Sequence, residues 1–304
     1  MSVDSPRAAQ KFACSNCGAT MSFDAGSQTL RCPFCGTQMA VRATGAAVPT
    51  IDAPQFVLPF TLDKGASIEK VRDWLGDSFF APGDLKSRSA LDRGQGTYVP
   101  FWRFDADCES DWEGEVSQTQ TRHVVRNFTG SDGKQERRMI DEEYKTWHPR
   151  GGSHSGHHRT HVCASHGLTQ AEADRLMPFP EEGMRTFSTD LLVGYAAEEP
   201  GVDERGAWET GETRVREMER GECKAQVERL TKVDTNISNR QTAVCYLPVW
   251  LYGYKYGGKQ FRVLVNGHTG EIVGDRPVSK MKVWLVVGVI ALAVLAIVLL
   301  IWLL

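Results

Sequence analysis

The last part of the sequence is one unbroken apolar run. Every position from Val283 to Leu304 is uncharged, and the run is rich in Val, Leu, Ile and Ala. A helix of this length spans roughly 33 Å, which matches a bilayer core of about 30 Å. A soluble helix of this length has polar residues on one face, and none occur here. The pattern predicts a single transmembrane helix at residues 283–304.

Apolar and polar positions alternate with a period of two at two related places in the middle of the chain. The segments 98–102 (Tyr-Val-Pro-Phe-Trp) and 246–250 (Tyr-Leu-Pro-Val-Trp) each lead into such a run. Period two predicts half-buried strands, and the proline fits at a strand start. A Leu-Pro-Phe or Met-Pro-Phe segment and a helical pattern precede each copy. We therefore expect an α+β fold with a duplicated body at 55–279, its halves at about 55–150 and 175–279, and antiparallel strands covered by helices.

Turn signals and helical spacing add detail to this body. Glycine pairs and Asn-Gly separate the apolar runs after residue 250, which predicts a meander of three strands. Helical spacing is present at residues 67–75 and at about 205–231. The second of these stretches is polar, and we expect it to be a solvated helix packed by a few apolar positions.

Two cysteine pairs near the N-terminus have the spacing of a metal site. Cys14-Ser-Asn-Cys17-Gly and Cys32-Pro-Phe-Cys35-Gly each offer two thiolates from a tight turn. Four soft ligands that converge from two turns suit tetrahedral Zn²⁺, and a closed set of four cysteines predicts a structural ion. We expect a zinc ribbon at residues 1–42, with a hairpin between the pairs, and a flexible linker at 43–54 that lets the ribbon move.

Composition and charge limit the remaining choices. The chain has 304 residues, is 41% hydrophobic and carries a net charge of −3, so it can bury a core and has no overall field that attracts nucleic acid. The polar first ten residues predict no secretory signal peptide. Four of the eight cysteines are scattered, which indicates ordinary reduced thiols, not a disulfide framework. Arg276, Lys280 and Lys282 precede the apolar run, so we expect a single-pass protein of the cytoplasmic membrane with its N-terminal bulk in the cytosol.

The order of these features resembles a known bacterial family. The cysteine pairs, the two Tyr-apolar-Pro-apolar-Trp segments, the block Val265-Asn-Gly-His-Thr-Gly-Glu-Ile-Val-Gly-Asp-Arg-Pro277 and the apolar tail occur in that order. This order resembles zinc-ribbon membrane proteins of the transcription factor IIB type, often labelled as similar to primosomal protein N-prime (replication factor Y), a superfamily II helicase. The resemblance implies a zinc ribbon and an anchor, and some members are associated with phage-shock-type membrane-stress proteins.

Helicase or ATPase activity is not supported by the residues. ATP hydrolysis needs a phosphate-binding loop, Gly-x4-Gly-Lys-Ser/Thr. The segments 130–135 and 257–260 are the nearest candidates, and both lack the spacing and the hydroxyl. We therefore expect no enzyme of this kind.

A histidine-rich segment at residues 148–166 is a candidate for a second metal site. The candidate ligands are His154, His157, His158 and His161. Imidazoles at this density bind Zn²⁺, Cu²⁺ or Ni²⁺. Three alternatives stay open: a glycine-rich loop in which histidine is merely polar, a protonation switch between pH 5 and 7, and thiol catalysis by His161 with Cys163.

These features together favour a membrane-anchored adaptor over two rivals. In the leading hypothesis one structural Zn²⁺ holds the ribbon, and the chain binds a cytosolic or membrane-associated protein without catalysis. The first rival is a membrane-tethered nucleic-acid-binding protein that uses the ribbon and a basic cluster made of Arg122, Arg126, Lys134, Arg137 and Arg138. The second rival is an enzyme whose site lies between the two halves of the body.

Overall fold

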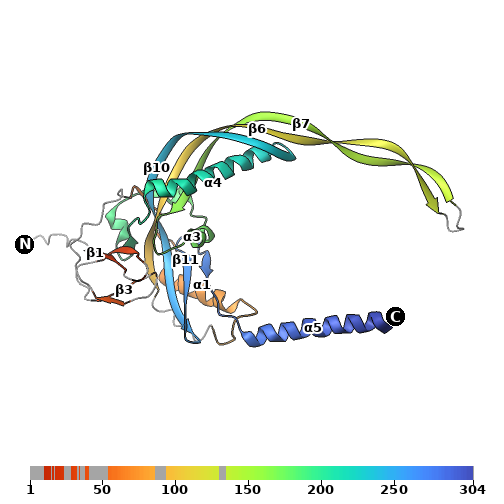
Figure 1. Ribbon diagram of the computed structural model, residues 1–304. Helices are drawn as coiled ribbons and strands as arrows, with labels where there is room; N and C mark the ends of the chain where they lie inside the picture. The colour runs from red at the N-terminus through yellow and green to blue at the C-terminus, as the bar shows by residue number, and fades with distance from the viewer. Residues whose placement is uncertain are drawn as a thin grey trace, which may run out of the picture. The chain divides into compact units, whose positions relative to one another are not determined.

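The computed structural model describes residues 10–14, 16, 18–23, 29–32, 34, 38–40, 54–85, 94–129 and 135–303. Over these residues the fold is mixed α/β, with one large sheet, a separate two-stranded sheet and four α-helices (Figure 1). The helices are α1 (Lys64–Gly76), α3 (Gln170–Leu176), α4 (Glu204–Lys224) and α5 (Lys280–Leu303). The strands are β1 (Gln10–Ala13), β2 (Thr20–Phe23), β3 (Thr29–Arg31), β4 (Gln38–Ala40), β5 (Phe56–Val57), β6 (Gln95–Thr129), β7 (Gln135–Cys163), β8 (Arg185–Thr186), β9 (Ala196–Glu198), β10 (Arg229–Tyr256), β11 (Lys259–Asn266) and β12 (Ile272–Gly274).

The chain divides into two compact units, and three strands and one helix contribute to both. Unit 1 comprises residues 1–102, 162–207 and 243–304. Unit 2 comprises residues 103–161 and 208–242. The second unit is therefore built from the distal parts of β6, β7, β10 and α4.

The sheet of unit 1 follows the order β1-β2-β9-β6-β10-β11-β12. The three strands β10, β11 and β12 are antiparallel, and this confirms the predicted meander. Two other pairs differ from the antiparallel arrangement that we expect, because β5 pairs with β10 and β9 pairs with β6 in parallel. The helix expected at residues 67–75 is α1, capped at its start by the side chain of Asp63.

Four short strands surround the described cysteines of the N-terminal segment. β1 pairs with β2 on either side of residues 14–19, and β3 pairs with β4. The sequence suggests a hairpin between the two cysteine pairs, whereas β2 and β3, the strands between them, lie in separate sheets. Gly18 has a φ of +77°, and its N–H donates to the carbonyl of Cys14. This left-handed conformation is the reason for a glycine there.

The described residues of the N-terminal segment pack into the core of unit 1. Cys14, Ala19, Cys32 and Phe34 are buried in one cluster with Leu168. Arg262 donates to the carbonyl oxygens of Phe34 and Gly167, which ties the second cysteine turn to the body. This packing differs from the independent motion that we expect for the ribbon. The expected linker at 43–54 lies outside the described residues except for Pro54.

Unit 2 is a sheet with one helix packed on one face, and its strands alternate between buried and exposed positions. On β6 the even-numbered residues from Phe104 to Gly114 are buried, and from Cys108 onward the odd-numbered residues between them are exposed. Helix α4 runs along these strands (Figure 1). Its buried positions Val215, Glu219 and Cys223 follow one another at intervals of four residues, so they share one face of the helix.

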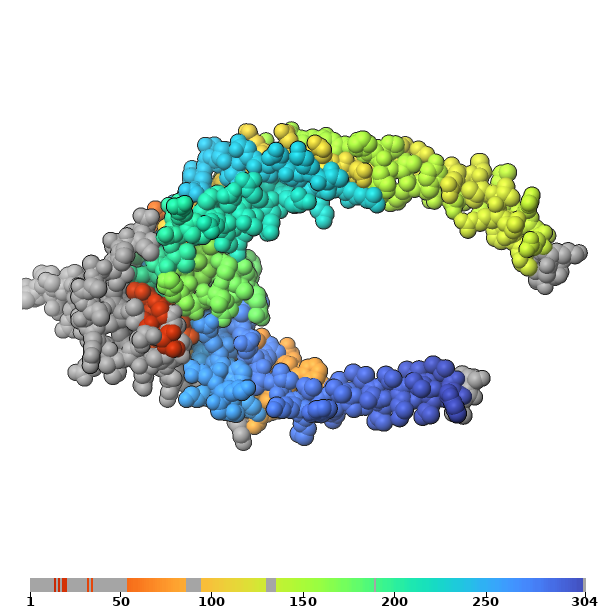
Figure 2. All heavy atoms as spheres, in the orientation of Figure 1, coloured from red at the N-terminus to blue at the C-terminus, as the bar shows by residue number. Residues whose placement is uncertain are grey.

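Beyond α4, the paired strands β6 and β7 continue as a two-stranded ribbon (Figure 1). We call residues 118–129 and 135–150 the arm. Thr231, near the start of β10, donates to the carbonyl of Glu113, so the described arm lies past the end of β10 and pairs only within itself. None of the described arm residues is buried, and most of the arm extends beyond the other elements in the view of Figure 2. At its base, Arg229 of β10 lies over the ring of Trp147, with its Cζ 3.4 Å from the ring centroid. Two-stranded hairpins have little stability of their own in water.

Helix α5 is long and apolar enough to span a membrane. The most apolar 18-residue stretch within Lys280–Trp302 has a mean hydropathy of 3.2, and 0% of that stretch is buried. Its start is tied to unit 1, because Ser279 N–H donates to the carbonyl of Phe80 and Lys282 Nζ donates to that of Ala81. Most of the large apolar side chains along α5 are exposed, with exposed fractions from 37% at Val283 to 87% at Trp302.

Candidate functional site

A cluster of metal-binding side chain types lies inside unit 2, between its sheet and α4. Cys108 comes from β6, His154 and His158 come from β7, and Glu219 and Cys223 come from α4. Period two places residues 154 and 158 on the same face of β7, and that face is turned to α4. The cluster thus unites three segments that are far apart in the sequence.

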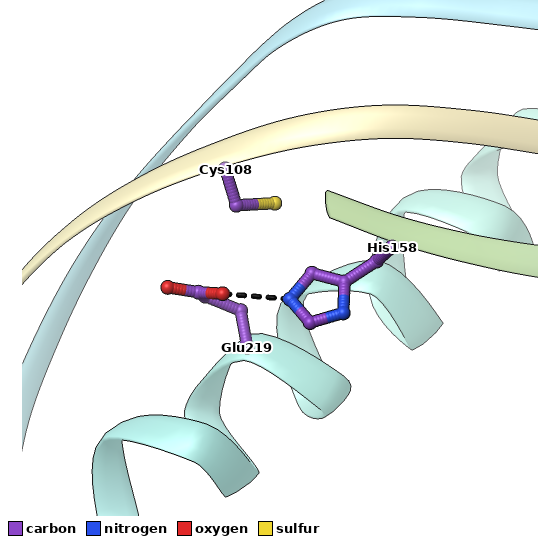
Figure 3. Close-up of side chains that lie close together, drawn as sticks. All are labelled: Cys108, His158 and Glu219. Atoms are coloured by element: carbon purple, nitrogen blue, oxygen red, sulfur yellow. Dashed lines mark hydrogen bonds and ion pairs between the residues drawn. The ribbon is translucent and has the colours of Figure 1, made fainter. Parts of the chain in front are cut away.

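The carboxylate of Glu219 is the centre of this cluster. Its Oε1 lies 2.8 Å from His154 Nδ1, and its Oε2 lies 2.6 Å from His158 Nε2. The ligand atoms of Cys108, His158 and Glu219 all lie within 4.8 Å of one another (Figure 3). The ligand atoms of His154, Glu219 and Cys223 also lie within 4.8 Å of one another. In Figure 3 the thiol, the imidazole and the carboxylate converge from β6, β7 and α4 on one small volume.

Burial increases toward the centre of the cluster. The exposed fraction of the side chain is 25% for His154, 11% for His158 and 0% for Glu219. A Cβ at Gly156 would lie 2.9 Å from Glu219 Oε2 and 3.1 Å from His158 Nε2, so only glycine leaves room between the two histidines. The apolar cluster of Ala106, Cys108 and Val215 lies beside Glu219, and it excludes water from one side.

The electrostatics of the cluster favour an ionised carboxylate and neutral thiols. Burial raises the pKa of Glu219, but hydrogen bonds from His158, His154 and Ser110 outweigh it and hold the pKa below its usual range. Burial, followed by the negative charge of Glu219, raises the pKa of Cys108 to about 11. Burial also raises the pKa of Cys223. A thiol in such surroundings is a poor nucleophile as it stands, whereas a bound metal cation would stabilise its thiolate form.

The structure separates the four histidines that the sequence suggests as a second metal site. His154 and His158 share Glu219, whereas His157 Nδ1 lies 2.8 Å from Asp107 Oδ1 on the opposite face of β7. His161 lies on the same face of β7 as His157, four residues further along the strand. Burial, followed by the positive charge of Arg103, lowers the pKa of His161 to about 4. Residues 148–163 of the histidine-rich segment belong to strand β7, so the loop that we considered is not formed there.

Sequence analysis missed Glu219, Cys108 and Cys223 as members of this site. The sequence around Glu219 is strongly charged, which led to the expectation of a solvated helix. Two signals were available in the sequence. The first is the alternation Gly152-Ser-His154-Ser-Gly156-His-His158, which puts glycines and histidines on one face of a strand. The second is the interval of four residues from Val215 to Glu219 to Cys223, which puts these three side chains on one face of a helix. Neither signal says which helix meets which strand.

The basic cluster proposed for nucleic acid lies on the arm and is paired with carboxylates. Arg122 and Arg126 each bind Glu142, with nitrogen–oxygen distances of 2.6 Å. Arg138 binds Glu136 at 2.8 Å, and Lys134 lies outside the described residues. A phosphate at Arg122, Arg126 or Arg138 would have to displace the carboxylate that each of them binds.

The predicted zinc site of the ribbon is only partly within the described residues. Cys14 and Cys32 are buried and belong to the same core cluster of unit 1, whereas Cys17 and Cys35 lie outside the described residues. The carbonyl of Cys14 accepts a hydrogen bond from Gly18 N–H at 2.9 Å. The four-cysteine zinc site stays a prediction.

Comparisons with known proteins give one relative. The chain is 26% identical to the uncharacterized protein YdjG of Bacillus subtilis, over 90% of this chain and 91% of that protein. No family model matches the sequence, and no solved structure matches it. The likeness extends along nearly the whole of both chains, and it assigns no activity to this one.

Proposed function

We propose that this chain is a membrane-anchored adaptor that binds a protein partner at the membrane surface and has no catalytic activity of its own. The observation that carries the proposal is α5, a helix that is uninterruptedly apolar from Val283 onward and whose large apolar side chains are mostly exposed. Burying such a helix in lipid removes a large apolar surface from water. The free energy gained is about 25 cal/mol for each Å² of apolar surface buried. A bilayer is the environment that these residues fit.

The surroundings of α5 support a position of unit 1 close to the bilayer, on the cytosolic side. Phe79, Phe80 and Met281 are exposed apolar residues near the start of α5, and Trp284 is exposed within its first turns. Aromatic side chains favour the membrane interface, and positive residues such as Lys282 favour the cytosolic side. The short distance in sequence between the body and α5 keeps unit 1 at the surface.

The arm is the surface that we assign to the protein partner. It has exposed backbone edges on both strands, and it carries the exposed apolar side chains Val125, Phe128 and Met139. An unpaired strand edge accepts a further strand from another protein, and the apolar side chains then give specificity. Because Arg122 and Arg126 are paired with Glu142, this surface suits a protein better than a nucleic acid.

Two further parts of the proposal rest on sequence. The ribbon at residues 1–42 holds one structural Zn²⁺ on Cys14, Cys17, Cys32 and Cys35, and the body at 55–279 is duplicated around its two Tyr-apolar-Pro-apolar-Trp segments. The described ribbon residues pack on unit 1, so the ion stabilises part of the body and not an independent module.

The experiment that tests the adaptor proposal is photocrosslinking in intact membranes. A photoreactive residue at Met139, which is 70% exposed on the arm, is compared with one at the exposed Lys259 of unit 1. The proposal expects a discrete protein adduct from position 139 that is absent from position 259. The absence of any adduct from the arm, or the same adducts from both positions, contradicts it.

A further inference from the structure

The buried cluster around Glu219 has more ligand groups than a structural role requires. One protonated histidine would neutralise a buried carboxylate, yet Glu219 contacts both His154 and His158. Two cysteine thiols, Cys108 and Cys223, lie within reach of the same carboxylate. Imidazole, thiolate and carboxylate together are the ligand types that proteins use for zinc and its neighbours among the transition metals.

The spacing of the three most central ligands is close to that of a coordination sphere. At metal–ligand distances of about 2.1 Å, the ligand atoms of a tetrahedral site are roughly 3.4 Å apart. The atoms of Cys108, His158 and Glu219 lie within 4.8 Å of one another, so shifts on the order of 1 Å bring them onto one ion. Gly156 leaves open the space beside His158 and Glu219 that a larger residue would occupy.

Charge balance also favours a divalent ion. Zn²⁺ with one carboxylate, one thiolate and a neutral imidazole has no net charge, which a buried site requires. A hard ion such as Mg²⁺ or Ca²⁺ prefers oxygen ligands throughout, and Glu219 is the only carboxylate in either three-residue ligand group among the described residues. The chemistry therefore selects a borderline or soft transition metal.

We propose that unit 2 contains a transition-metal site in which Cys108, His158 and Glu219 bind one Zn²⁺ ion or a similar ion. His154 orients the carboxylate through its hydrogen bond to the other oxygen, which is the common role of a group behind a metal ligand. The ion connects β6, β7 and α4, and it replaces the direct hydrogen bond between His158 and Glu219. This site is separate from the predicted ribbon site and goes beyond the adaptor proposal.

The test is the zinc content of the full-length chain in detergent after dialysis against a zinc buffer. Replacement of one ligand, in His158→Asn or Glu219→Gln, is expected to lower the zinc content by one ion per chain. The matched control is His157→Asn, a histidine on the same strand whose side chain lies on the opposite face against Asp107, and it is expected to lose none. Because each value is a difference from wild type, metal in the ribbon does not affect the result.

A second pair of variants keeps the test decisive if a ligand variant unfolds. Cys108→Ser keeps the size of the side chain at position 108 and leaves both histidine contacts of Glu219 in place. With Co²⁺ as the probe, this variant is expected to lose the part of the thiolate-to-metal charge-transfer absorption that comes from one cysteine ligand. His154→Asn is expected to weaken zinc binding by about 10- to 100-fold without abolishing it. Equal zinc in wild type and in folded His158→Asn, or an equal loss in His157→Asn, overturns the proposal. Neither result affects the crosslinking test of the adaptor proposal.

Discussion

The buried carboxylate of Glu198 in β9 gives a prediction about pH. Glu198 accepts hydrogen bonds from Ser165 Oγ at 2.6 Å and from the backbone N–H groups of His166 and Gly167 at 3.1 and 3.3 Å. These bonds favour the charged form, whereas complete burial disfavours it. Burial is the larger effect, and it raises the pKa of Glu198 to about 7.

The sign and size of the effect on stability follow from this pKa. The usual pKa is 4.5, so the difference is 7 − 4.5 = 2.5. At about 1.4 kcal/mol per unit this corresponds to roughly 3 kcal/mol. Because the folded pKa is raised, the stabilisation is fully present below pH 4.5 and is lost as the pH rises through about 7.

The variant Glu198→Gln cannot ionise, so it is expected to lack this loss of stability. Thermal unfolding of the full-length chain in detergent is followed by near-ultraviolet circular dichroism from pH 5 to pH 8. Relative to the variant, wild type is expected to lose about 2–3 kcal/mol over this interval, which corresponds to a melting shift of roughly 5–10 °C. Glu199→Gln, at the adjacent position, is the control and keeps the wild-type profile.

The result that refutes this reasoning is a stability difference between wild type and Glu198→Gln that does not change from pH 5 to pH 8. Such a result means that the three hydrogen bonds outweigh burial and that the carboxylate is ionised throughout this interval, in the folded as in the unfolded chain.

Two other substitutions and one truncation test the packing and the anchor. In Gly167→Ala the new Cβ would lie 2.2 Å from the ring of Phe34, so we expect a loss of about 1–3 kcal/mol and faster proteolysis of the N-terminal segment. Gly221→Ala on α4 meets no atom within 4 Å and is expected to raise the melting temperature by the equivalent of about 0.5–1 kcal/mol, whereas a loss would mean that α4 is frayed there. Truncation after Ser279 is expected to release the chain from membranes in a flotation gradient, and continued flotation would show a second membrane contact.

The local sequence determined several features of this protein. The apolar character of α5 is set by its own residues, since no partner is needed to predict that such a helix leaves water. The alternation of apolar and polar residues in β10–β12 and the glycine turns between these strands are also local signals. They were sufficient to predict the three-stranded meander. Gly18 after the first cysteine pair is left-handed for the same local reason.

Tertiary structure alone decided the cluster in unit 2. His158 and Glu219 are 61 residues apart in the chain, and their contact depends on which face of β7 meets which face of α4. The charged residues around Glu219 made α4 look solvated, although an interval of four residues places Glu219 between the buried Val215 and Cys223. Gly156 indicated a loop by composition, whereas in the folded chain it gives Glu219 and His158 room to meet. Composition and periodicity describe one segment at a time, and a site made by three segments exists only once they are packed.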